Sequence, residues 1–523
     1  MKTNWSVNTI CILILLYVSF LPFKAGRFDC NSLNDDAYIS LCYAKNIASG
    51  NGFVINHDPP TLGTTTPLFT LTVAGIGRLI GSINFAQIGI YLNVFGWALI
   101  PWIIVLFRRV LALKIWEAVI VGLCVITFGA PNIGSETIPF QALLVSAVAF
   151  FAARRYHAAG FIVGLLTLCR GEGFLLVPIF AMTLFLREMH GKRWRIIGLA
   201  REVRDSYRNS KAGFLLSNPL FQMIFGISIP LLLWVVYAQV TFGYFIPQTL
   251  RIKIQQGSGF PMEAQFFGQL VKNIQQWTLL GLRRRAIPGF DVIKWGLVAV
   301  GIVTVVMKRR GFLPYIIWCI CYTVAYTGFG VPGWFWWYRI PIYWCFTFLS
   351  AFGLIYSMNL LFRPLEKIVR RRDVIPGGVA TLIVFAVVML HIPDTNRPIQ
   401  DPRSNIYRKV SEWMNTNTHP RQSLASTEVG YFGYFTSNRI IDKSGLTMPR
   451  GYDYSGNHDW NDFLLNYKPD YFIRGAKCPR GCPKRLIVKD IVYRRIKIYK
   501  PRNGRDDYAL YKRKKPSAVH KKR

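Results

Sequence analysis

The sequence predicts a polytopic α-helical membrane protein that carries a small α/β domain at its C-terminal end, outside the membrane. First, 52% of the 523 residues are hydrophobic and only 17% are charged, whereas soluble chains average about 25% charged residues. Second, the 63 Lys and Arg residues are clustered between long apolar runs. Third, short strands and an amphipathic helix replace these runs after Pro393. This composition disfavours a cytosolic enzyme and excludes a disordered chain. The net charge of +37 indicates membrane loops and no nucleic-acid partner.

Eleven apolar segments in the first 392 residues are candidates to cross a bilayer whose core is about 30 Å thick. The first has Lys2 before its apolar core, as a signal peptide does, but no A-x-A cleavage site follows, so we expect an anchor. The segments are residues 8–23, 85–107, 115–131, 138–153, 158–170, 172–187, 219–240, 292–307, 312–328, 338–362 and 374–392.

Basic loops predict the orientation of these segments. The positive-inside rule places the five dense Lys/Arg loops in the cytoplasm; they lie at 108–114, 154–155, 187–211, 308–310 and 363–372. The apolar stretch 66–81 would break this alternation if it crossed the membrane. We therefore expect it to form an interfacial or re-entrant helix inside the first outer loop, residues 24–82. The N-terminus is then cytoplasmic and the C-terminus lies outside the cytoplasmic membrane.

The predicted domains are a membrane domain, residues 1–392, and an extracytoplasmic α/β domain, residues 393–523, that ends in a basic tail. In the second domain the pattern predicts a helix at 406–417 and strands at 439–443, 470–475, 491–499 and 507–512. Cys478 and Cys482 are expected to form a disulfide there, because a C-x-x-x-C pair lacks a second ligand pair for zinc.

Two adjacent carboxylates, Asp35 and Asp36, follow the first span in a chain that has only 26 acidic residues. One interpretation is a helix start, in which Asn34 or Asp35 is the cap and Asp36 favours the positive helix end. The other is chemistry: paired carboxylates act as a general base or bind a divalent cation such as Mg²⁺ or Mn²⁺. Both interpretations stay open on spacing alone.

The stretch NDDAYISLCYAKNIASGNGFVINHDPPTLGTTTPLF, residues 34–69, contains this pair. It resembles the first-loop signature of the GT-C glycosyltransferases, nearest to the branch of the mycobacterial terminal arabinofuranosyltransferase. The branch pattern runs D-D-A-Y-I-x-x-R-Y-A-x-N, then G-x-G-x-V-x-N, then T-S-P-L-W. The chain departs from it at Cys42, where Arg is usual, and at Gly63-Thr64, where Gly-Tyr is preferred. It matches at Asp35, Asp36, Ala37, Tyr38, Tyr43, Asn46, Gly50, Gly52, Asn56 and Thr66-Pro67-Leu68.

Further short pieces of the signature follow in the same order, and the resemblance covers about residues 30–450. Each piece is weak by itself, but all lie on the side of the membrane that the charges predict to be outside. They are Gly134-Ser135-Glu136-Thr137, Arg170-Gly171-Glu172-Gly173, Ile246-Pro247-Gln248-Thr249 with Lys253, Trp337-Tyr338 with Pro341, Glu428-x-Gly430, and Asp442-x-x-Gly445-Leu446-x-x-Pro449.

The resemblance implies a glycosyltransferase whose catalytic residues are Asp35 and Asp36, and a single displacement there would invert the anomeric centre. The expected substrate-binding residues are Tyr38, Tyr43, Asn46, Glu136, Arg170, Glu172, Arg251, Lys253, Trp337, Tyr338 and Arg339. A guanidinium fork suits a lipid phosphate, and aromatic faces suit sugars. Several of these residues have an ordinary alternative: a helix cap at Glu136, an ion pair between Arg170 and Glu172, snorkelling cations at 251 and 253, and an interfacial aromatic belt at 337–338.

The sequence thus predicts a glycosyltransferase that moves a sugar from a polyprenyl-phosphate donor to a hydroxyl of a cell-envelope glycan or glycolipid, outside the cytoplasmic membrane. No Gly-rich phosphate loop is present in a strand–turn–helix setting, which agrees with a donor that is not a nucleotide sugar. A transporter or flippase of lipid-linked glycans is the alternative, as is a ligase that uses a diphosphate-linked donor. The lack of an inverted repeat and the folded outer domain disfavour the transporter.

Overall fold

The computed structural model describes residues 4–25, 30, 33–55, 59–127, 133–191, 218–249, 252, 261–274, 277, 289–333, 335–368, 375–395, 403–448, 460–476, 482–500 and 507–514. These residues are mostly helical, and the chain divides into two compact units. The helical unit is Met1–Phe28, Tyr91–Val236 and Gly259–Pro398. The mixed unit is Asp29–Ile90, Tyr237–Ser258 and Ile399–Arg523.

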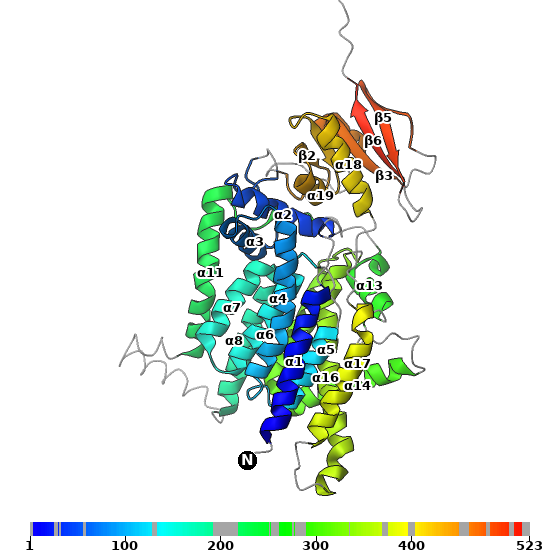
Figure 1. Ribbon diagram of the computed structural model, residues 1–523. Helices are drawn as coiled ribbons and strands as arrows, with labels where there is room; N and C mark the ends of the chain where they lie inside the picture. Colours follow the sequence, from blue (N-terminus) through cyan, green and yellow to red (C-terminus); the bar gives the residue numbers. More distant parts are fainter. Residues whose placement is uncertain are drawn as a thin grey trace, which may run out of the picture. The chain divides into compact units, whose positions relative to one another are not determined.

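Every predicted span has a helix in the structure (Figure 1). Five helical stretches are long and apolar enough to cross a membrane: 85–106, 219–242, 290–308, 310–328 and 336–363. Shorter apolar stretches in the described residues include 8–20 within the helix Asn4–Ala25 and 377–387 within the helix Ile375–Thr395. The count of eleven spans therefore stays a prediction. The helices are α1 (Asn4–Ala25), α4 (Phe85–Leu106), α5 (Ile115–Thr127), α6 (Thr137–Ala152), α7 (Tyr156–Cys169), α8 (Leu176–Gly191), α11 (Pro219–Phe242), α14 (Phe290–Lys308), α15 (Leu313–Gly328), α16 (Ile340–Ile368) and α17 (Ile375–Thr395).

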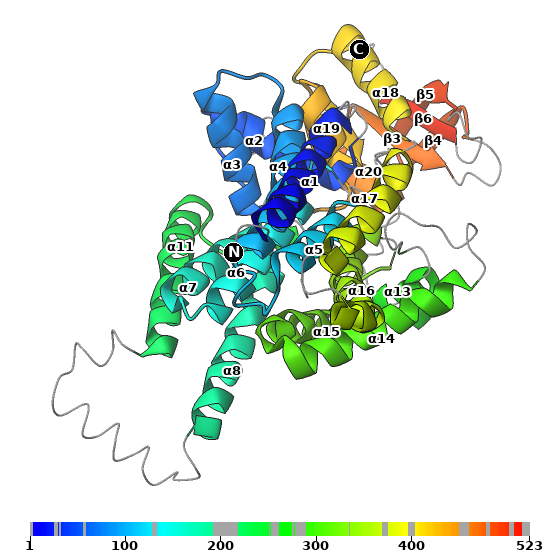
Figure 2. The same ribbon diagram turned by 60° about the horizontal axis from the view of Figure 1, so that its bottom comes forward.

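Within the helical unit, α5 packs against α1, α16 and α17, and α14 lies along α16 (Figures 1 and 2). A Cβ added at Gly301 of α14 would lie 1.9 Å from the carbonyl oxygen of Leu349 in α16. Glycine at this position lets the two backbones approach closely, which is how helices associate where there is no hydrophobic driving force between them. Short elements complete this unit: η1 (Gly171–Leu175), η2 (Met262–Ala264), α13 (Phe266–Asn273), η5 (Arg310–Phe312) and η6 (Trp336–Arg339).

A buried ion pair joins three elements of the helical unit. Arg309 Nη2 lies 3.1 Å from Glu117 Oε2, and the two side chains are only 8% and 6% exposed. Glu117 also accepts hydrogen bonds from the backbone N–H of Lys114 at 2.9 Å and from Asn359 Nδ2 at 3.0 Å. The Arg309 guanidinium donates to the carbonyl of Ala112 as well. One carboxylate and one guanidinium thus hold the 107–114 loop, the start of α5 and the middle of α16 together.

The mixed unit contains a six-stranded sheet in the order β2-β1-β3-β6-β5-β4. The β2-β1-β3 part is parallel and the rest is antiparallel. Its helices are α2 (Asp35–Ala48), α3 (Pro67–Leu79), α18 (Ser404–Asn417), α19 (Val429–Phe435) and α20 (Trp460–Tyr467). Its strands are β1 (Ser423–Ser426), β2 (Arg439–Asp442), β3 (Tyr471–Ala476), β4 (Arg485–Val488), β5 (Ile491–Tyr499) and β6 (Asp507–Arg513).

The predicted helix at 406–417 and all four predicted strands are confirmed as α18, β2, β3, β5 and β6. The sequence did not predict β1, β4, α19 or α20. Each of these is between four and eight residues long, which is too short for a hydrophobic period to be recognised. The apolar stretch 66–81 forms α3; its position in a membrane interface stays a prediction.

Candidate functional site

The Asp35–Asp36 pair lies in the first turn of α2. Asn34 is the N-cap, and its Oδ1 accepts a hydrogen bond from the backbone N–H of Ala37 at 2.8 Å. Both carboxylates therefore lie beside the positive end of the helix, where negative charge is favourable. The capping interpretation is thus confirmed for Asn34.

Asp35 connects α2 to α19, although the two helices are far apart in the sequence. Its Oδ1 accepts a hydrogen bond from the backbone N–H of Tyr431 at 2.7 Å. A Cβ added at Gly430 would lie 2.2 Å from the Asp35 carbonyl oxygen and 2.5 Å from the Ile39 nitrogen. Only glycine fits at this contact, which explains the Gly of the Glu428-x-Gly430 motif.

The electrostatics around Asp35 favour a proton-carrying role. Burial raises the pKa of Asp35 well above its usual range, and the nearby charges of Glu428 and Asp36 raise it further. The hydrogen bonds from the backbone of α19 lower it in part. Glu428 is paired with Arg403, with Nη1 2.7 Å from Oε1. A carboxyl whose pKa lies closer to neutrality is better suited to general-base chemistry than an ordinary aspartate.

Tyr38, Tyr43 and Asn46 support α2 and its neighbouring segments. The fully buried Tyr38 ring packs against Tyr431 and Phe435 at centroid distances of 4.9 and 5.2 Å. Tyr43 is also fully buried. Asn46 Nδ2 donates to the carbonyl of Val54 at 2.8 Å and so holds the loop after α2. Their contacts to substrate stay a prediction, while their packing contacts are present in the structure.

Three of the short motifs converge in the mixed unit. Gln248 donates from its backbone N–H to Leu62 O at 3.3 Å and from its Nε2 to Gly445 O at 3.2 Å. Thr249 Oγ1 donates to Gly63 O at 2.9 Å. The first-loop Gly63, the 246–249 motif and the 442–446 motif are thus parts of one structure, which the order of motifs in the sequence could not show.

Asp442 organises the last of these motifs. Its carboxylate is fully buried and accepts hydrogen bonds from the backbone N–H groups of Ser444 and Thr447, at 2.7 and 2.9 Å, and from Thr447 Oγ1 at 3.1 Å. Burial raises the pKa of Asp442 to about 6, although these hydrogen bonds lower it. The motif is therefore a turn built around one buried carboxylate.

This shift predicts a pH dependence of stability. The folded chain binds a proton at Asp442 more tightly than the unfolded chain, so the free energy of unfolding should fall as pH rises from about 4 to 6 and then level off. The expected total is about 3 kcal/mol, from a shift of about 2 pKa units. Thermal unfolding between pH 4 and 7 should show this component in the wild type and not in Asp442→Asn. The exposed Asp490→Asn should keep the wild-type slope; an unchanged slope in Asp442→Asn would contradict the assignment.

A second cluster lies in the helical unit at the break between α7 and α8. Arg170 Nη1 lies 3.3 Å from Glu136 Oε1, and its Nη2 lies 2.9 Å from Glu172 Oε1. The guanidinium is 4% exposed and lies 5.0 Å from the centroid of the Tyr338 ring. Tyr326 donates to Glu172. The ion-pair interpretation is confirmed for Arg170 and Glu172, and two carboxylates against one arginine leave a formal charge of −1.

Arg339 lies in η6, and its hydrogen-bond partners differ from those of Arg170. It is 6% exposed, its Nη1 donates to Gly333 O at 2.9 Å, and in the described part of the chain its Nε is buried without a hydrogen-bond partner. The neighbouring Tyr338 is buried, and its carbonyl accepts from Tyr322 at 2.9 Å. Trp337 is partly exposed and packs edge-on to Trp336.

Some predicted residues cannot be placed. Arg251, Lys253 and Cys478 lie outside the described residues, so their roles and the disulfide stay predictions. Among the residues that are described, no group of three or more His, Cys, Asp and Glu side chains is arranged to hold a metal ion. Sequence reasoning missed Tyr326 and Arg403, because neither belongs to a short motif and each is recognised only by its carboxylate partner.

A family model described as a domain of unknown function, DUF8728, matches residues 397–511, which is less than half of the chain. None of the curated protein sequences matches the chain.

Three solved structures match most of its length. The archaeal oligosaccharyltransferase AglB from Archaeoglobus fulgidus, in complex with an inhibitory peptide and a dolichol-phosphate, has a TM-score of 0.54 and 12% identity, covering 90% of this chain and 69% of that chain. The oligosaccharyltransferase of the same organism in its apo form has a TM-score of 0.53 and 13% identity, covering 91% of this chain and 70% of that chain. ArnT from Cupriavidus metallidurans, bound to undecaprenyl phosphate, has a TM-score of 0.54 and 13% identity, covering 98% of this chain and 98% of that chain. A likeness at this identity shows the fold alone, and this chain shares its fold with these three structures.

Proposed function

We propose that this chain is an integral-membrane glycosyltransferase of the outer side of the cytoplasmic membrane. It transfers a sugar from a polyprenyl-phosphate donor to a hydroxyl of a cell-envelope glycan or glycolipid. The observation that carries the proposal is Asp35, a carboxylate that is fixed by the backbone of α19 and has a raised pKa. The fold and the lipid phosphates bound by AglB and ArnT support it.

In this proposal Asp35 is the general base. Its Oδ1 is held by the Tyr431 N–H, so its second oxygen takes the proton of the acceptor hydroxyl as that oxygen attacks the anomeric carbon. The bond from the anomeric carbon to the phosphate oxygen breaks, and the electron pair leaves with the lipid phosphate. A single displacement of this kind inverts the anomeric centre. Burial, the charge of Glu428 and the charge of Asp36 all raise the pKa of Asp35.

Arg339 is the preferred partner for the donor phosphate. Arg170 is already paired with Glu136 and Glu172, whereas Arg339 donates to a carbonyl and has a buried Nε without a partner in the residues described. A buried cation with spare donors suits a phosphate that gains charge as the sugar departs.

Arg339→Gln should weaken binding of a short-chain polyprenyl-phosphate analogue by about 10- to 150-fold, because a charge-assisted hydrogen bond contributes about 1.5–3 kcal/mol. Binding is measured in nanodiscs. Arg339→Lys keeps the charge and should retain part of the affinity, and the exposed Arg310→Gln is the matched control. Wild-type affinity of a folded Arg339→Gln protein would place the phosphate elsewhere.

A divalent cation, Mg²⁺ or Mn²⁺, at Asp35 and Asp36 stays part of the proposal. The described residues supply two adjacent carboxylates there, one of which already accepts from Tyr431. This set is too small to fit a dedicated site by itself, so no step above passes through a metal. Transfer assays with and without a chelator test the requirement.

The proposed orientation has its own test. Alkaline phosphatase fused after Gly475 should be active, because the enzyme folds only outside the cytoplasm, and a fusion after Lys308 should be inactive. The reverse pattern would contradict the topology and the outside location of Asp35. Transfer of labelled sugar to a soluble acceptor separates this function from a flippase, which moves the lipid without breaking its glycosidic bond.

A further inference from the structure

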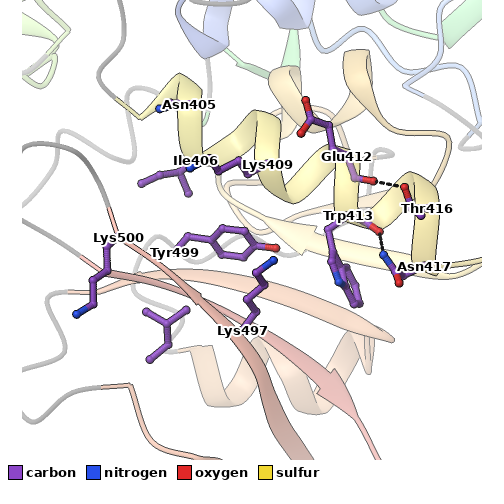
Figure 3. Close-up of a pocket in the computed structure, with 11 residues that line it drawn as sticks. Asn405, Ile406, Lys409, Glu412, Trp413, Thr416, Asn417, Lys497, Tyr499 and Lys500 are labelled. Atoms are coloured by element: carbon purple, nitrogen blue, oxygen red, sulfur yellow. Dashed lines mark hydrogen bonds between the residues drawn. The ribbon is translucent and has the colours of Figure 1, made fainter.

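A groove of about 590 Å³ lies in the mixed unit between α18 and the end of β5 (Figure 3). This volume is within the range of about 300–1,000 Å³ that is typical of small-molecule sites. The groove contains none of the residues described around Asp35, namely Asp36, Glu428, Gly430 and Tyr431. It is lined by Asn405, Ile406, Lys409, Glu412, Trp413, Thr416, Asn417, Lys497, Ile498, Tyr499 and Lys500.

A bulge in β5 creates this lining. The register with β6 shifts between Arg495 and Lys497, so side chains after the shift point to the opposite face from those before it. Lys497 and Tyr499 pair with Leu510 and Tyr508, and the Tyr508 ring contacts Tyr407 of α18 at 5.8 Å. The bulge therefore turns Lys497 and Tyr499 toward α18, away from the hydrophobic core on the other face.

Aromatic and polar groups line the inner part of the groove. Trp413 is partly exposed along it, and Figure 3 shows the Trp413 ring directed toward β5. Tyr499 is 5% exposed, and within the described ranges its hydroxyl is buried without a hydrogen-bond partner. An unpaired buried hydroxyl costs free energy, so a ligand that supplies a partner there is favoured. Asn405, Thr416 and Asn417 add polar groups at the rim.

The charge of the groove is positive. Lys409, Lys497 and Lys500 are all exposed in the lining, and Lys497 Nζ lies 5.3 Å from the centroid of the Tyr499 ring. The one lining carboxylate, Glu412, is paired with Arg408 at 3.0 Å. The lining thus carries three lysines against one carboxylate, which is paired with Arg408.

We propose that this groove binds an acidic saccharide. A sugar ring lies against Trp413, as aromatic faces suit the apolar face of a sugar, and a carboxylate or phosphate on the sugar pairs with Lys409 and Lys497. This binding goes beyond the proposed transfer reaction and does not depend on it. That the bound saccharide is the acceptor glycan is a further step, and this step rests on the proposed function.

The test uses the full chain in nanodiscs of zwitterionic lipid, with trigalacturonate as the acidic probe and maltotriose as the neutral probe of equal length. Binding of trigalacturonate should exceed that of maltotriose and weaken with added salt, because exposed charges are screened. Lys409→Gln combined with Lys497→Gln should reduce trigalacturonate affinity by about tenfold. Lys484→Gln, an exposed lysine outside the groove, is the matched control and should bind as the wild type does.

Two further arms decide between this ligand and other anions. Asp35→Asn should bind trigalacturonate as the wild type does, so loss of transfer and loss of binding are separable. Wild-type affinity in the Lys409/Lys497 double variant would overturn the proposal. Equal affinity for inorganic phosphate, glycerol phosphate or a short oligonucleotide would also overturn it, because the groove would then be a general anion surface or a lipid or nucleic-acid site.

Discussion

Asp35→Asn is expected to lower the rate of sugar transfer about 10²- to 10⁴-fold, the usual loss when a general base is removed. The substitution is conservative for the fold, because an asparagine oxygen can still accept the 2.7 Å hydrogen bond from Tyr431. Donor binding and thermal stability should therefore stay close to wild type. The measurement is single-turnover transfer from a polyprenyl-phosphate sugar, with protein integrity checked by thermal unfolding.

The matched variant is Asp36→Asn, which removes a neighbouring charge and leaves the base in place. It should lower the pKa of Asp35, because the repulsion that raises it is reduced, and the loss of rate should be smaller. In the wild type kcat/KM should rise as pH rises through the pKa of Asp35, since the ionised form accepts the proton. If Asp35→Asn turns over at the wild-type rate, Asp35 is a structural link between α2 and α19 and nothing more.

Arg309→Ala is expected to cost about 3–5 kcal/mol of stability, because it leaves the buried Glu117 carboxylate without its cation. The remaining hydrogen bonds from Lys114 and Asn359 cannot neutralise that charge. Removing both charges with Glu117→Gln and Arg309→Gln should recover part of the loss. The measurement is the unfolding midpoint in detergent.

The neighbouring Arg310 supplies the control. It is exposed, and its Nε donates to the backbone carbonyl of Val306 near the end of α14, so Arg310→Ala should change stability by no more than about 0.5 kcal/mol. Equal effects of the Arg309 and Arg310 substitutions would contradict the role given to the buried pair.

The sequence was informative wherever the physical signal is local. Runs of apolar residues predicted every span-length helix. β5 and β6 were recognisable because they are nine and seven residues long and rich in Ile, Val, Leu and Tyr. The Asp35–Asp36 pair was recognisable because adjacent carboxylates beside a span are costly without a task.

Partnerships between distant residues were not predictable. The hydrogen bond from Tyr431 to Asp35 joins residues that are 396 positions apart, and the one from Tyr326 to Glu172 joins residues that are 154 positions apart. A single sequence holds no distance information of this kind. Gly430 shows the same limit: its motif was visible, but the reason for glycine appears only when α19 is seen against the backbone of α2.

The hydrogen bond between Asp35 and Tyr431 also determines when, during synthesis, this part of the protein can form. Asp35 emerges from the ribosome early, and its backbone partner is made 396 residues later. At about 5–20 residues per second this is a delay of roughly 20 to 80 s. Throughout that interval the Asp35 carboxylate lacks the Tyr431 N–H that fixes its direction in the folded chain. Under the proposed function, transfer therefore begins only when the last quarter of the chain is in place, and half-made copies do not consume donor lipid.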